Sequence, residues 1–279
     1  MPIPILKSWG KYFSNYDEGL GSSYERIVLN KKLEAVCKHF RVKRVLEAPI
    51  FGFTGVSGIN SVYLAKKGCE ISLVDHDKKR LEMINSVWEK IGLPVKTFFS
   101  ENYNKLPFSD NEFDLSWNFS AIWFAENLEK FLSELSRVTS KVIFISVPNR
   151  NGLGYHALKF LEKEEMKKYL KEENIIPGNI IKILAEKGWD LLIKDYIDCP
   201  PWPDIGMPKK KFLKIFGLDW LIKEKVQAPV SIMDYYLGKD ENFPEKMMRY
   251  YWLEKHAPNF VKMFWSHHKY LLFIPRKEK

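Results

Sequence analysis

The chain is poor in cysteine, and its cysteines have no spacing typical of a metal site or a disulfide framework. It has three of them in 279 residues, widely separated. An odd number at such spacing matches neither zinc motifs nor the scaffolds of small secreted proteins. We therefore predict no metal site and a reducing, cytoplasmic location.

Long apolar runs are also missing. No uninterrupted hydrophobic stretch approaches the roughly 20 residues that a membrane-spanning helix needs. Residues 1–13 lack the basic head, apolar middle and small-residue cleavage site of a secretory signal. We expect no transmembrane segment and no secretion.

Positive charge is in excess, with a formal net charge of +9. Such a balance suits an anionic partner, for example nucleic acid, a lipid surface or a phosphorylated substrate. It equally suits a solvated surface rich in lysine and glutamate. The lysines are spread along the chain apart from one cluster, Lys209–Lys211 with Lys214. This spread favours the solvated surface, although nucleic acid remains a possible partner. The sequence does not indicate the oligomeric state.

What the chain does have is an alternation of short β-branched runs with longer amphipathic segments. Five short apolar strands separated by helices are typical of a parallel sheet covered on both faces. Two further strands follow later in the chain. The predicted strands are 42–47, 70–74, 95–99, 114–118, 141–147, 189–197 and 268–275, and the predicted helices are 59–67, 78–91, 128–138, 158–173 and 178–187.

The strongest motif spans residues 45–82. A strand ends in Glu47, a glycine-bearing loop and a helix follow, and a second strand ends in Asp75. In doubly wound sheets, ligands bind beyond the carboxyl ends of the strands. Glycines let the backbone approach a ligand there, and the first turn of a helix offers unpaired N–H groups. A carboxylate in the position of Asp75 can accept hydrogen bonds from both hydroxyls of a ribose.

This motif resembles the first two motifs of the class I S-adenosylmethionine-dependent methyltransferases. In that family an acid ends the first strand and a loop of the form acid-x-Gly-x-Gly-x-Gly follows. Residues 106–124 and 136–149 resemble the family's approaches to its fourth and fifth strands, so the resemblance covers about residues 40–150. It implies an α/β fold with a doubly wound, mostly parallel seven-stranded sheet (Rossmann-like), S-adenosyl-L-methionine as cofactor, and methyltransferase activity.

The loop after the first strand departs from the family pattern. Ala48 or Pro49 stands at the position of the family's first glycine, and the loop is several residues longer. Gly52, Gly55 and Gly58 are available to approach the cofactor, and Gly58 is the best match to the family's last glycine.

The resemblance also implies roles for individual residues. Glu47 would lie near the amino group of the cofactor's methionine part, Asp75 would bind the ribose hydroxyls, and His76 would lie against the adenine. The remaining cofactor-binding candidates are Glu101 and Asn102, where the family usually has an acid for the adenine amino group, and Asn118 and Phe119, which with Ser120 would face the sulfonium and the acceptor.

We predict four segments on this basis. Residues 1–40 form an N-terminal helical cover, and residues 41–197 form the Rossmann-like core that binds the cofactor. Residues 198–265 form a helical insertion, either a lid or an acceptor-recognition unit, and residues 266–279 hold the closing strand of the core.

No catalytic residue is identified from the sequence. Methyl transfer from a sulfonium is an in-line displacement that needs alignment and exclusion of water. It needs a general base only where the nucleophile holds a proton at working pH. The candidate bases are His156, Asp198, His267 and His268.

The acceptor is predicted by exclusion. The Asp/Asn-Pro-Pro-aromatic motif of amino-methylating nucleic-acid enzymes and the Pro-Cys pair of cytosine-C5 enzymes are both absent. The aromatic insertion suits a small-molecule or lipid-like acceptor. The alternatives are an RNA or protein acceptor docked on the basic insertion, or a non-catalytic methyltransferase-like scaffold subunit. A dinucleotide-dependent oxidoreductase would want a tight Gly-x-Gly-x-x-Gly turn, which residues 47–58 do not offer.

Overall fold

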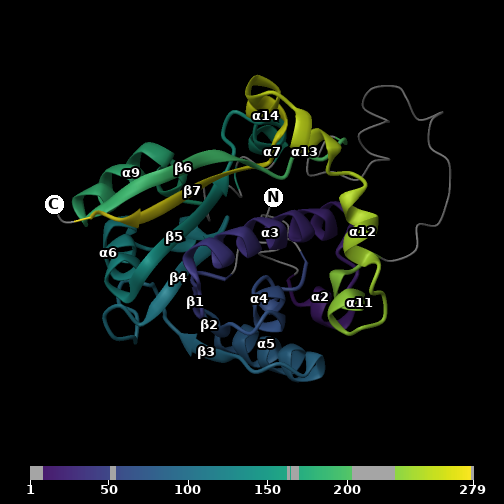
Figure 1. The fold of residues 1–279 in the computed structure, drawn as a ribbon, viewed down its shortest axis with the longest axis horizontal. Coiled ribbons are helices and arrows are strands. Elements are labelled where there is room, and N and C mark those ends of the chain that lie inside the picture. Colours follow the sequence, from purple (N-terminus) through teal and green to yellow (C-terminus); the bar gives the residue numbers. More distant parts are fainter. Residues whose placement is uncertain (1–8, 51–54, 162–163, 165–169, 203–229, 278–279) are drawn as a thin grey trace.

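The computed structural model describes residues 9–50, 55–161, 164, 170–202 and 230–277, and these form one α/β unit built on a seven-stranded sheet (Figure 1). The strand order is β3-β2-β1-β4-β5-β7-β6. The strands are β1 (Arg44–Glu47), β2 (Glu70–Asp75), β3 (Lys96–Phe99), β4 (Phe113–Phe119), β5 (Thr139–Pro148), β6 (Trp189–Ile197) and β7 (His268–Pro275).

The sheet is parallel except at one strand. β1 pairs in parallel with β2 and β4, β2 with β3, and β4 with β5, whereas β7 is antiparallel to both β5 and β6. The chain reverses its strand order after β3, so β1 and β4 lie side by side at the switch point where doubly wound sheets bind ligands. The predicted doubly wound, mostly parallel seven-stranded fold is confirmed.

Helices cover both faces of the sheet. One face packs on α3 (Gly19–Phe40), α4 (Val62–Lys66) and α5 (Lys78–Ile91), and the other on α6 (Leu128–Val138) and α9 (Pro177–Glu186). Side chains along β5 alternate between the two layers: Val142 and Phe144 join the first core, and Ile143 and Ile145 the second. This period of two is what a strand buried on both faces requires.

The helices nearest the switch point begin and end at identifiable residues. The Asp77 side chain accepts a hydrogen bond from the Arg80 N–H and caps α5, which ends at Gly92 in the left-handed region. The Asn127 side chain caps α6 in the same way. The position of each cap fixes where the preceding loop meets the carboxyl edge of the sheet.

Two predicted helices differ from the structure. The helix expected over 59–67 is shorter in the structure, where it is α4 (Val62–Lys66). The side chains of Asn60 and Ser61 turn toward Glu47 before this helix begins. The helix expected over 158–173 begins earlier, as α7 (Leu153–Leu161), after a turn at Asn149. Residues 172–175 form a 3₁₀ turn, η2 (Glu172–Ile175), in which the Asn174 side chain donates to the backbone carbonyls of Ile122 and Ala125.

Between β6 and β7, the described residues form four short helices: α11 (Ile232–Tyr236), α12 (Phe243–Met248), α13 (Trp252–His256) and α14 (Asn259–Trp265). A further short helix, α2 (Lys11–Ser14), precedes α3. The predicted lysine cluster, Lys209–Lys211 with Lys214, lies outside the described residues, as does Gly52.

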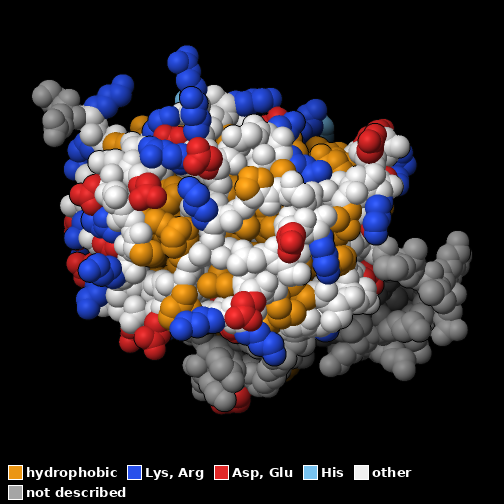
Figure 2. Space-filling view, turned by 90° about the horizontal axis from the view of Figure 1, so that it is seen from below, with side chains coloured by type: hydrophobic (Ala, Val, Ile, Leu, Met, Phe, Trp, Pro, Cys, Tyr) orange, Lys and Arg blue, Asp and Glu red, His pale blue; other side chains and the backbone are white. Residues whose placement is uncertain are grey.

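The described surface shows no large block of one charge on the face drawn in Figure 2, where lysine and arginine side chains alternate with acidic ones around hydrophobic patches. Within the described part of the chain, no helix combines the length and apolar character needed to cross a bilayer.

Candidate functional site

Glu47 ends β1 as a buried carboxylate at the switch point. The Asn60 side-chain N–H donates to one carboxylate oxygen at 3.0 Å, and the Ser61 hydroxyl donates to the other at 2.6 Å. Burial raises the pKa of Glu47 to about 7, although these two hydrogen bonds and the nearby Arg26 pull it down. The group is therefore poised to carry a negative charge close to neutral pH, which suits contact with a ligand ammonium.

Arg26, on α3, joins the N-terminal helix to this carboxylate. Its guanidinium donates to the carboxylate of Glu18 at 3.0 and 3.2 Å, to the Val56 carbonyl at 2.8 Å, and to the Asn60 side-chain oxygen. Arg26 and Glu18 are both buried. A chain of hydrogen bonds therefore runs from α3 through Asn60 to Glu47.

The loop between β1 and α4 packs closely at two glycines. Gly55 and Gly58 both have positive φ, at 99° and 73°. A Cβ on Gly58 would lie 2.6 Å from an Ile84 side-chain carbon, and one on Gly55 would lie 2.7 Å from the Glu18 Cβ. Only glycine fits these positions, for steric reasons as well as for backbone conformation.

Ala48 and Pro49 connect the end of β1 to that loop. Their peptide bond is cis, and Ala48 is buried with its N–H donating to the Trp117 carbonyl. This hydrogen bond extends the β1–β4 pairing past the end of β1 and holds the start of the loop on the sheet.

Asp75 ends β2 and is fully buried, but it is not free. Arg80 donates to both of its carboxylate oxygens, at 2.7 and 2.5 Å, and the Asp77 N–H donates to one of them at 2.9 Å. A carboxylate has about four acceptor positions in all. One ribose hydroxyl can therefore be added directly, and a second requires that Arg80 shifts.

His76 lies in an aromatic corner beside Asp75. Its Nδ1 is 2.7 Å from the Tyr103 hydroxyl, and its ring stacks with Phe124 at 6.0 Å and 27°. Burial lowers the pKa of His76, which favours the neutral imidazole. A flat neutral surface of this kind is suited to an adenine ring.

The two predicted adenine-side residues lie beside this corner rather than in it. Glu101 is exposed, and the Asn102 side chain accepts a hydrogen bond from the Asn104 N–H. Tyr103, which the sequence analysis did not identify, is fully buried and lies against His76.

The end of β4 carries a buried amide whose donors and acceptor are unused. Asn118 is fully buried, and neither its side-chain oxygen nor its nitrogen has a hydrogen-bond partner among the described residues. Burying an unpaired amide costs about 1–3 kcal/mol, so a ligand that pairs with it gains that much. Together with Glu47 and the two glycines, this orphaned amide fits a ligand bearing an amino-acid head group at the switch point.

Three of the four predicted bases come together just past β4. His268 Nδ1 lies 2.6 Å from the Ser120 hydroxyl, and its Nε2 lies 2.6 Å from a carboxylate oxygen of Glu25 on α3. His267 Nδ1 bonds to Asp198 Oδ2. The fourth candidate, His156, is exposed on α7.

The group, which we call the carboxylate–histidine cluster (Glu25, Asp198, His267 and His268), lies mostly out of solvent. Burial raises the pKa of Asp198 to about 7 and lowers the pKa of His268. The ring of Phe119 packs on His268 at 4.6 Å. The cluster therefore lies directly beyond the β4 residues that were predicted to face the acceptor.

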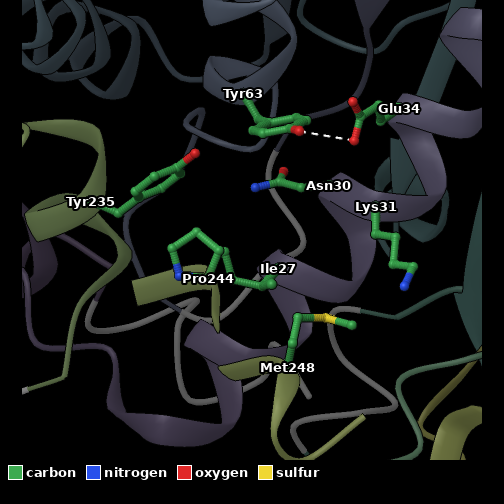
Figure 3. A pocket seen from close by; sticks show the side chains of 8 residues that line it. All are labelled: Ile27, Asn30, Lys31, Glu34, Tyr63, Tyr235, Pro244 and Met248. Carbon is green, nitrogen blue, oxygen red and sulfur yellow. Dashed lines mark hydrogen bonds between the residues drawn. The ribbon is translucent and has the colours of Figure 1, made fainter. Parts of the chain in front are cut away.

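A separate pocket of about 320 Å³ lies where α11 and α12 pack against α3 (Figure 3). In it, the Tyr63 hydroxyl donates to Glu34 at 2.9 Å, Asn30 lies next to this pair, and Tyr235 lies to the left in the view. It contains none of the predicted cofactor residues.

Sequence reasoning missed the residues that α3 contributes, Arg26 and Glu25. Both lie on a helix of 22 residues with buried side chains around much of its circumference, so its pattern does not show which polar residue faces the sheet. Asn60 and Ser61 could have been identified from the sequence, because they are two consecutive polar residues at the predicted start of a helix that faces the carboxylate.

Comparisons with known proteins come from sequence and from structure. Residues 54–142 match a protein family described as a methyltransferase domain. An uncharacterized protein of Methanocaldococcus jannaschii is 26% identical over 187 residues, which are 66% of this chain and 82% of that protein.

Several solved structures share the fold at low identity. The 4+2 cyclase SpnF has a TM-score of 0.52 and 13% identity, over 89% of this chain and 81% of its own. The YcgJ protein of Bacillus subtilis has a TM-score of 0.50 and 13% identity, over 89% and 99%. A possible histamine N-methyltransferase of Thermotoga maritima has a TM-score of 0.51 and 12% identity, over 70% and 82%. Because one of these proteins is named as a cyclase, the shared fold by itself does not fix a reaction.

Proposed function

We propose that this chain, as a member of the class I S-adenosylmethionine-dependent methyltransferases, methylates a small-molecule or lipid-like acceptor inside a buried site. It is an enzyme, and S-adenosyl-L-methionine is its methyl donor. The observation that carries the acceptor proposal is the enclosed carboxylate–histidine cluster beyond β4.

The residues at the switch point would hold the cofactor as follows. Glu47 and the orphaned Asn118 amide would bind the amino-acid head group, Asp75 the ribose, and His76 the adenine. Ala48, Pro49 and Gly58 would shape the backbone between them, and Gly52 is assigned to the same loop by the resemblance alone. When bound, the sulfonium supplies an activated methyl group. Glu101 and Asn102 would border the adenine from the solvent side.

The chain's own residues would align the acceptor and exclude water. Phe119 presents an aromatic ring next to His268, and an aromatic ring stabilises a nearby cationic centre through its quadrupole. An acceptor that holds a proton would pass it to the Ser120 oxygen as the Ser120 hydroxyl proton moves to His268 Nδ1, while Glu25 at Nε2 fixes the orientation of the ring. The catalytic role of His268 is part of the proposal.

The same cluster disfavours a polyanionic acceptor. Glu25 and Asp198 meet here, and Glu254 is close enough to raise the pKa of Asp198 further. A concentration of carboxylates repels phosphate groups, so an RNA acceptor would meet like charge at the point of methyl transfer.

We assign residues 1–40, which include α3, as the cover of the site, and residues 198–265 as the lid or acceptor-recognition unit.

The test of the cofactor site is calorimetry with S-adenosylhomocysteine on three proteins. Asp75→Asn should weaken binding by at least tenfold relative to the wild type. Asp114→Asn is the matched control, because Asp114 is a buried carboxylate at the opposite end of the sheet, where it accepts hydrogen bonds from the Lys43 and Arg44 N–H groups. Unchanged affinity in Asp75→Asn would defeat the site, and no binding by the wild type at millimolar ligand would favour the scaffold alternative.

The acceptor class needs a second measurement. Transfer of a labelled methyl group should be detected with fractions of small metabolites or lipids and not with total RNA or protein. Salt-sensitive labelling of RNA would favour the macromolecular alternative instead.

A further inference from the structure

We propose that Glu25, Asp198 and His268 bind one divalent transition-metal ion, such as Mn²⁺ or Zn²⁺. The three residues come from α3, from the residue after β6 and from the first residue of β7. Each offers one ligand atom, and these atoms all lie within 4.8 Å of one another. The proposal concerns metal binding alone and does not depend on the identity of the methyl acceptor.

The spacing is close to that of a bound ion. Nitrogen and oxygen ligands lie about 2.0–2.2 Å from zinc, so the donor atoms of a site are about 3–4 Å apart. Glu25 is the least buried of the three, with its side chain 13% exposed, against 3% for Asp198 and 6% for His268. The Glu25 side chain therefore has the most room of the three to move when an ion binds.

An unused carboxylate oxygen points independently to a cation. Asp198 is 2% exposed, and its Oδ1 is buried with no hydrogen-bond partner among the described residues. Its other oxygen already bonds to His267. A buried carboxylate oxygen with open lone pairs is costly unless a positive charge or a donor meets it. A metal ion at the cluster would supply that charge.

The hydrogen bonds around His268 and Asp198 match those of metal sites. A histidine that binds a metal through one nitrogen almost always hydrogen-bonds through the other, and a metal-binding carboxylate is itself hydrogen-bonded. His268 uses Nδ1 for the Ser120 hydroxyl and so directs Nε2 toward Glu25. Asp198 uses Oδ2 for His267, which leaves Oδ1 available.

The donor set selects the class of ion. Two carboxylates and one imidazole suit Mn²⁺, Fe²⁺ or Zn²⁺ better than Ca²⁺ or Mg²⁺, which prefer oxygen ligands throughout. Three protein ligands leave at least one coordination position open. If the proposed function holds, that position faces the acceptor side of β4, and a metal at Nε2 would take His268 out of its role as the base.

The test uses the full chain after treatment with EDTA. Mn²⁺ binding is followed by loss of the free-ion paramagnetic resonance signal, and Zn²⁺ binding by calorimetry. We expect one site per chain and at least tenfold weaker binding in Glu25→Gln and in His268→Ala. His156→Ala, which removes an exposed histidine outside the cluster, should bind as the wild type does.

Two results would overturn the proposal. One is the absence of stoichiometric binding of either ion by the wild type. The other is unchanged affinity in both cluster variants, with circular dichroism showing that they are folded. S-adenosylhomocysteine titrations on the same samples separate this outcome from a failure of the cofactor site, because the two sites use different side chains.

Discussion

The carboxyl edge of the sheet has two parts, one at β1 and β2 and one at β4 and β7. Buried carboxylates in the two parts have different interaction partners. At β1 and β2, Arg80 neutralises Asp75 with two hydrogen bonds, and Arg26 does the same for Glu18. At β4 and β7, the ion-pair partners of Glu25 and Asp198 among the described residues are imidazoles. In the first part, Asp75 and Glu18 are balanced by arginine, whose charge is permanent, and Glu47 is held by the neutral side chains of Asn60 and Ser61. In the second part, the carboxylates are balanced by groups that can be neutral at physiological pH.

This difference separates a scaffold from a reactive site. Permanent ion pairs hold the loop, α3 and α5 in fixed positions around the place for the cofactor. The carboxylate–histidine cluster keeps a surplus of negative charge that a proton, a metal ion or a cationic acceptor can satisfy. Strong structural consequences are therefore expected from mutations in the first part, and weak ones from mutations in the second.

The largest effect is expected from Arg26→Met. The substitution leaves Glu18 as a buried charge without its partner, which costs about 3–5 kcal/mol in the free energy of unfolding. Urea denaturation would measure it. Arg137→Met is the control, because Arg137 makes similar ion pairs with Glu134 and Asp110 while 31% exposed, and exposed pairs contribute about 0–1 kcal/mol. Equal losses in the two variants would remove the distinction between the two kinds of pair.

Gly58→Ala should give the next largest decrease in the free energy of unfolding. A left-handed backbone costs a non-glycine residue about 1–2 kcal/mol, and overpacking against Ile84 adds about 1–3 kcal/mol. Gly68→Ala isolates the backbone part, since Gly68 also has positive φ but no atom within 4 Å of the added Cβ. Thermal unfolding of both variants would show whether the Ile84 contact matters; identical losses would mean that it does not.

The pH dependence of cofactor binding should follow the ionisation of the Glu47 carboxyl group. Its pKa of about 7 means that the carboxylate becomes charged as the pH rises from 6 to 8, so affinity for S-adenosylhomocysteine should increase about tenfold over that range. Glu47→Gln should bind weakly with no such dependence. Wild-type affinity that is flat between pH 6 and 8 would contradict the role of Glu47.

The same shift has a consequence of opposite sign for stability. Because the folded pKa of Glu47 lies above the usual value of 4.5, the stabilisation it gives is fully present below about pH 4.5 and is lost as the pH rises through 7. Glu47→Gln should remove this part of the pH dependence of unfolding.

The smallest effect is expected from Glu25→Gln in metal-free protein. Removing one carboxylate from a cluster with surplus negative charge should change the free energy of unfolding by less than about 1 kcal/mol. Denaturation under the conditions used for Arg26→Met gives the direct comparison. A loss as large as that of Arg26→Met would show that the cluster is structural.

Local patterns were sufficient to predict the fold and the first part of the edge. The strand endings at Glu47 and Asp75 and the glycine stop at Gly92 are all visible within a short stretch of chain. Asp75 and its partner Arg80 are five residues apart, yet the pairing was not predicted, because a helix start gives no sign of which side chain turns back to the sheet.

The second part depends on contacts that no local pattern contains. Glu25 and His268 are separated by almost the whole chain, and Asp198 meets His267 only because β6 and β7 pair antiparallel with Ile197 opposite His268. The two predicted strands carried a signal for this: once they are taken as an antiparallel pair, residues 198 and 267 must be neighbours.

The most direct test of the account is a crystal structure with S-adenosylhomocysteine bound. We predict the head group between Glu47 and Asn118, the ribose on Asp75 and the adenine against His76, with the sulfur toward Phe119 and Ser120. A complex in which this space stays closed by Arg80 and the β1–α4 loop, or in which the ligand binds elsewhere, would contradict it.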